Sequence, residues 1–211
     1  KRFYSKLLTY YTFGTLIFGL GMMVFGLEIS KLFAKRVEYF DAWTIFPYII
    51  FSIVLGMMKD VVTTGLSISK KTKVIAFTVI IAASINLILN YILIKLMGNQ
   101  GAALSKMLSM FVFFWLTFYY AQKVYPIPYE LKRIFLMMSV AAALYIFSML
   151  FNSWQTFPRL GVKMLIVLSF PIILYFAGFF EKLEIDTIKR GWKMWRDPSA
   201  IAENFNRLIK K

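Results

Sequence analysis

The sequence contains neither cysteine nor histidine, and only 10 of its 211 residues are acidic. Disulfide bonds, thiolate or imidazole metal sites and histidine acid–base catalysis are therefore excluded. No Walker motif, glycine-rich phosphate loop or pair of catalytic carboxylates is recognisable either. We therefore expect neither an enzyme nor a bound cofactor.

Charged residues are scarce, whereas apolar residues dominate. Only 17% of residues are charged, 60% are hydrophobic and the mean hydropathy is +0.68. Soluble domains have about a quarter charged and about half apolar residues. A chain of this length cannot bury so much apolar surface in one aqueous core, so we predict an integral membrane protein.

Six segments are long enough to cross a bilayer, which requires about 20 apolar residues. They lie at residues 7–28, 43–66, 74–97, 102–121, 134–151 and 161–180. Short connections predict antiparallel hairpins, and the alternating pattern of a membrane β-barrel is absent. We predict an all-α, polytopic membrane helix bundle over residues 1–180 and a separate tail at 181–211.

Basic residues are distributed unevenly between the two sides of this bundle. Most of the 25 Lys and Arg residues lie at the chain ends and in the connections after the second and fourth spans. Because basic connections stay on the cytoplasmic side, both ends are predicted to be cytoplasmic, in the cell membrane. The loops near residues 30–41, 98–101 and 152–160 are predicted to face outward.

Two asparagines, Asn86 and Asn90, interrupt the third apolar span. Their spacing of four places them on one helix face, and an amide in hydrocarbon requires a hydrogen-bond partner. They either bond to a neighbouring helix or line a polar substrate cavity, and both interpretations remain open.

The next residues predict a tight helical hairpin at the outer surface. Gly98 can end a helix with positive φ, and the two polar residues after it would form the tip. Gly101 lets the chain turn back, while Ala102 and Ala103 keep the start of the next helix thin.

Ionisable residues within the spans are candidates for function. Lys106, about one turn into the fourth span, is the first candidate for a substrate contact, with snorkelling to the interface as the alternative. Lys59 is another cavity candidate, with interface anchoring as its alternative. Its neighbour Asp60 lies about 100° away around a helix, so no ion pair is expected. Glu28 is expected to be solvated at the outer end.

The spacing N-x-x-x-N-x-x-x-I-x-x-x-G-x-x-G-A-A at residues 86–103 resembles the polysaccharide transporter family. These proteins are the Wzx-like oligosaccharide flippases of the MOP superfamily. The basic turn GLSISKKTK at 65–73 and the segment at 25–49 are similar to that family too, and the resemblance covers residues 10–125.

The resemblance implies a cargo and a larger bundle. Family members carry a lipid-linked oligosaccharide, a precursor of polysaccharide, O-antigen or capsule, across the cytoplasmic membrane by alternating access. They have 12 to 14 spanning helices in two lobes, so the missing N-terminal helices would be a partner of this C-terminal portion. An anionic pyrophosphate cargo would suit the cations Lys106 and Lys59, with Asn86 and Asn90 as further cavity candidates.

Three other functions remain open. A MATE-like small-molecule exporter of the same superfamily usually has acidic groups in its cavity, whereas the charges in these spans are mostly basic. A membrane-bound glycan polymerase or transferase would require a large outer loop or several converging acids and bases. A membrane scaffold without transport would not need a hydrated region around Asn86.

The tail at 181–211 combines tryptophan with basic residues. Trp192 and Trp195 recur at helical spacing beside Lys189, Arg190 and Lys193. This pattern predicts amphipathic helices that bind anionic membrane lipid on the cytoplasmic side. We expect no nucleic-acid partner, although the net charge is +15.

Overall fold

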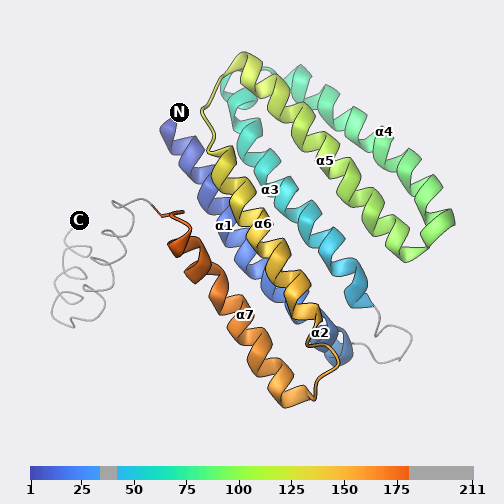
Figure 1. Ribbon diagram of the computed structural model, residues 1–211. Helices are drawn as coiled ribbons and strands as arrows, with labels where there is room; N and C mark the ends of the chain where they lie inside the picture. Colours follow the sequence, from blue (N-terminus) through green and yellow to red (C-terminus); the bar gives the residue numbers. More distant parts are fainter. Residues whose placement is uncertain (34–41, 181–211) are drawn as a thin grey trace, which may run out of the picture. The chain divides into compact units, whose positions relative to one another are not determined.

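The computed structural model describes residues 1–33 and 42–180, in which all regular structure is helical (Figure 1). Six helices there are long and apolar enough to cross a membrane. They are α1 (Arg2–Val24), α3 (Phe46–Ile68), α4 (Thr72–Met97), α5 (Asn99–Val124), α6 (Leu131–Met149) and α7 (Thr156–Phe176). The short helix α2 (Gly26–Phe33) follows α1. The predicted all-α polytopic fold is confirmed, and the chain is a multi-pass membrane protein. The predicted tail lies outside the described residues.

The first and last membrane helices are displaced from the predicted spans. α1 begins at Arg2 and ends at Val24, instead of covering 7–28, and Phe25 separates it from α2. α7 covers Thr156–Phe176 instead of 161–180, and continues past Pro171. An apolar window locates each end of a span only to within about one helical turn. Flanking polar residues join the helix as well, because their backbone groups need the same hydrogen bonds.

Residues Lys1–Phe170 form one compact unit. Within it, α5 packs along α3 and α4, while α1 packs along α3 and α6. Most of the fully buried side chains are aliphatic and include Leu8, Leu20, Val54, Val62, Leu66 and Met137. Because lipid tails are as apolar as these side chains, close van der Waals packing, more than exclusion from water, holds such helices together.

α4 is the most exposed membrane helix of the described part of the chain. Only Thr78 and Ala82 are buried on it, and it packs mainly on α5 (Figure 1). Its exposed residues include Ile80, Leu87 and Ile88, which suit contact with lipid. Most of the surface of α4 that does not contact α5 is therefore exposed in the described part of the chain.

A one-residue turn joins α4 to α5. Gly98 has φ +58° and lies between Met97, which ends α4, and Asn99, which begins α5. The two polar residues expected at the hairpin tip are therefore already helical. Gly101 is buried, and a Cβ at this position would overlap the carbonyl oxygen of Leu93. The close approach of the two helices thus requires glycine at residue 101.

Gly101→Ala should destabilise the protein by about 1–3 kcal/mol, because the added methyl group meets a backbone atom that cannot rotate away. Gly14→Ala is the matched control, since a Cβ on Gly14 of α1 would meet no neighbouring atom within 4 Å. Thermal unfolding of both variants in detergent, followed by circular dichroism, measures the difference. Equal melting temperatures for the two variants would contradict the close helix approach.

Candidate functional site

A cavity of about 220 Å³ lies between α4 and α5, and its mostly apolar lining includes three polar side chains. Its lining residues are Val79, Ala82, Ala83 and Asn86 from α4, and Lys106, Ser109, Met110 and Phe113 from α5. Two of the four predicted cavity residues, Asn86 and Lys106, therefore line the same cavity. The cavity is set on the two helices that the glycine-containing turn brings together.

A chain of hydrogen bonds runs through the two asparagines. Asn90 Nδ2 donates to Asn86 Oδ1 at 3.0 Å, and Asn86 Nδ2 donates to Ser109 Oγ at 3.2 Å. Ser109 Oγ in turn donates to the carbonyl oxygen of Ser105 at 2.7 Å. Asn86 thus has both roles that the sequence left open, because it bridges two helices and lines the cavity. Asn90 holds the Asn86 amide from the next helical turn.

Lys106 is the one ionisable residue among those that line the cavity. It is the eighth residue of α5, about 10 Å along the helix from Asn99. Its side chain is exposed, and no carboxylate of the described residues forms an ion pair with it. An unpaired cation is unfavourable in hydrocarbon, so its ammonium group requires water or an external anion.

Lys59 of α3 borders the same cavity through Phe113. Its ammonium group lies 4.9 Å from the centre of the Phe113 ring, in a cation–π contact, and also pairs with Asp60. The prediction that these neighbours do not pair was wrong, because the flexible lysine side chain can bend along the helix surface. The side chain of Lys59 is 19% exposed and that of Asp60 is 70% exposed.

A larger groove, with a volume of about 440 Å³, lies between α1 and α3. Its lining residues include Tyr10, Tyr11, Phe18, Ile53 and Met57, and its surface is almost entirely apolar. Such a surface suits lipid tails. The smaller α4–α5 cavity is the stronger candidate site because it contains a charged group and hydrogen-bonding groups.

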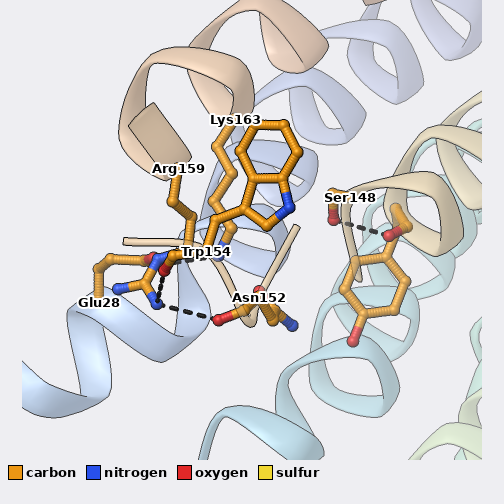
Figure 2. A network of polar contacts seen from close by, with 7 residues as sticks. Glu28, Ser148, Asn152, Trp154, Arg159 and Lys163 are labelled. Atoms are coloured by element: carbon orange, nitrogen blue, oxygen red, sulfur yellow. Dashed lines mark hydrogen bonds and ion pairs between the residues drawn. The ribbon is translucent and has the colours of Figure 1, made fainter. Parts of the chain in front are cut away.

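A second polar cluster connects α2 to α7, and Figure 2 shows Glu28 facing Arg159 and Lys163. Lys163 Nζ lies 3.0 Å from both carboxylate oxygens of Glu28, and Arg159 Nε lies 2.8 Å from one of them. Arg159 also donates to the carbonyl oxygen of Asn152 at 3.0 Å. The side chains of Glu28 and Lys163 are only 16% and 1% exposed. The expectation that Glu28 is solvated was wrong, because α7 covers it.

Sequence reasoning did not single out Arg159 and Lys163. They lie four residues apart at the start of α7 and share one face. Two basic residues at this spacing in an apolar helix indicate an acidic partner, but the partner Glu28 is 135 residues from Lys163 in the chain. We interpret the cluster as structural, because its three charged groups face one another and Lys163 is almost fully buried.

Glu130, between α5 and α6, fastens the start of α1. Its carboxylate pairs with Lys6 at 2.9 Å and Arg133 at 3.3 Å, and accepts a hydrogen bond from Thr9 at 3.0 Å. Partial burial alone would raise the pKa of Glu130. The hydrogen bonds from Lys6 and Thr9 and the charges of Arg133 and Lys6 outweigh burial and lower the pKa below its ordinary value of 4.5.

Comparisons with protein-family models, curated proteins and solved structures found no match for this chain. The resemblance to the polysaccharide transporter family therefore stays a prediction based on the hairpin motif and its neighbouring segments. Residues 1–33 and 42–180 contain no group of three Asp, Glu, His or Cys side chains that could hold a metal ion.

Glu28→Gln should destabilise the protein strongly, by about 3–5 kcal/mol, because two buried cations lose their counter-charge. Adding Lys163→Met should recover part of this loss, since one of those cations is then removed. Free energies of unfolding from denaturant titration in mixed micelles measure the effect. Asp60→Asn is the matched control, because an exposed ion pair contributes at most about 1 kcal/mol. Similar losses in Glu28→Gln and Asp60→Asn would contradict a buried cluster.

The Glu130 interactions predict a loss of stability in acid. Because folding lowers the pKa of Glu130, its contribution is complete above pH 4.5 and is lost as the pH falls through the lowered pKa. Between roughly pH 6 and pH 3, the melting temperature of the wild type should fall further than that of Glu130→Gln. Circular dichroism in one detergent provides both curves, and parallel curves would argue against these contacts.

Proposed function

We propose that the chain is part of a transporter that moves a lipid-linked oligosaccharide across the cytoplasmic membrane by alternating access, and that it is a flippase and not an enzyme. The observation that carries this proposal is the unpaired Lys106, beside Asn86 and Ser109, in a cavity between two membrane-spanning helices. An uncompensated cation within a membrane-spanning helix favours an anionic ligand.

The chemistry of such a cargo matches the cavity. A lipid-linked sugar has an anionic pyrophosphate, a hydroxyl-rich glycan and a long apolar tail. Lys106 would supply charge to the pyrophosphate, and the second N–H of the Asn86 amide would supply a hydrogen-bond donor beside it. The tail has to stay in the lipid while the head group crosses, which the exposed, sparsely packed side of α4 would permit.

Alternating access requires a second group of helices across the cavity. Further helices of the same protein would supply it, opposite the α4–α5 hairpin. The distribution of basic residues favours cytoplasmic positions for both ends of this chain. The basic tail at 181–211, outside the described residues, would then lie on anionic lipid of the inner leaflet.

Export of a small organic cation is the second candidate, and one observation points towards it. Asp60 is an acidic residue within a membrane helix, where it could attract a cation. Its pairing with Lys59 opposes this use, because the neighbouring ammonium group already compensates the carboxylate. No acidic residue lines the α4–α5 cavity.

The proposal predicts that Lys106→Gln slows transfer of a fluorescent polyprenyl-pyrophosphate oligosaccharide between leaflets of vesicles containing the full-length protein. A lost charge-assisted contact of about 1.5–3 kcal/mol corresponds to roughly a 10- to 150-fold slower rate. Lys106→Arg should retain most of the rate, because it keeps the positive charge.

Lys95→Gln is the matched control for this experiment. Lys95 is an exposed lysine of α4 that stacks on Tyr91 and lies outside the cavity. Equal rates for Lys106→Gln and Lys95→Gln would contradict a role of Lys106 in the transport path. Uptake of a soluble cation without transfer of the lipid-linked sugar would favour the exporter.

A further inference from the structure

Lys106 lines the cavity and has no ion-pair partner among the described residues, whereas Lys59, which borders the cavity through Phe113, has fixed partners. Lys59 lies on the Phe113 ring and pairs with Asp60. Asp60 is the one acidic residue within the six apolar helices of the described chain. Its side chain is 70% exposed, whereas that of Lys59 is 19% exposed. The ion pair therefore has a partly buried cation and a carboxylate that is open to its surroundings.

Phe113 connects the two lysines spatially. Lys106 and Phe113 both line the cavity, and their spacing of seven places them on one face of α5, about 10 Å apart along its axis. Lys59 covers the ring of Phe113 from α3. An unpaired ammonium group thus lines the cavity, and a paired one lies against the ring of Phe113, which lines the same cavity.

We propose that Asp60 competes with the anionic head group of the cargo for Lys59. Asp60 pairs with Lys59 while the cavity is empty and gives way when a phosphate group reaches the lysine. This inference rests on the proposed function and concerns regulation of the same site. The exchange is inexpensive, because the exposed carboxylate can rotate away and an exposed ion pair is weak.

The competition has a consequence for transport. A pyrophosphate carries more negative charge than one carboxylate, so it can displace Asp60 through stronger charge-assisted hydrogen bonds. When the cargo leaves, Asp60 pairs with Lys59 again, and the partly buried cation is not left uncompensated. Asp60 therefore weakens binding at Lys59 and favours release, as transport requires binding that is not too strong.

The test is a calorimetric titration of the full-length protein in detergent with inorganic pyrophosphate, at low and fixed salt. Asp60→Asn should lower the dissociation constant about two- to fivefold, the range expected for an exposed ion pair. The double variant Lys59→Gln/Asp60→Asn should lose this gain. Asp60→Glu should behave like the wild type, because it keeps the competing carboxylate. Melting temperatures within a few degrees of the wild type would confirm that all variants fold.

The outcomes separate this inference from the proposed function. An unchanged dissociation constant for Asp60→Asn, with binding by the wild type intact, would overturn the role of Asp60 and leave an anionic cargo supported. A lower dissociation constant that persists in the double variant would also overturn it. The tighter binding would then come from the changed net charge of the protein and not from the release of Lys59. Absence of pyrophosphate binding by the wild type and every variant would count against both the inference and the anionic cargo.

Discussion

Charged and amide groups within membrane-spanning helices must find their partners inside the protein, because hydrocarbon supplies none. Two clusters satisfy this constraint with a single carboxylate each. Glu28 joins α2 to α7 through Arg159 and Lys163, and Glu130 joins the connection before α6 to α1 through Lys6. Aliphatic packing sets the distance between helices but tolerates sliding, whereas these charge pairs specify which residues meet. The burial of Lys163 and Arg159 makes Glu28 in particular difficult to replace.

The α4–α5 cavity departs from this rule at one residue. Asn86 satisfies its amide through Asn90 and Ser109, yet Lys106 beside it has no carboxylate partner among the described residues. Lys59, on the far side of Phe113, does have one in Asp60. This difference between the lysine that lines the cavity and the lysine that borders it is easiest to understand if the missing counter-charge of Lys106 arrives with a ligand. This is the physical basis for proposing an anionic cargo.

The position of the cavity depends on the turn at Gly98. Gly101 packs against Leu93, and Asn86 bonds to Ser109, so both contacts belong to the same antiparallel register of α4 and α5. A longer turn would move the asparagines past their serine partner. A side chain at residue 101 would separate the helices and open the hydrogen-bonded chain. The small residues of the turn and the polar residues one to three turns away therefore form one structural unit.

Hydropathy and residue spacing alone determined the membrane class, the six spans and the helical hairpin. The bilayer permits few backbone structures, and a glycine after a long apolar run commonly ends a helix with a positive φ. The spacing of the asparagines also indicated a shared polar face. Only the tertiary structure decided the partners of the charges. Glu28 is buried by α7, whose Lys163 lies 135 residues later in the chain, and Lys59 reaches Asp60 because its long side chain bends along the helix. Periodicity describes the face on which a residue lies, but an ion pair depends on where two side chains end in space.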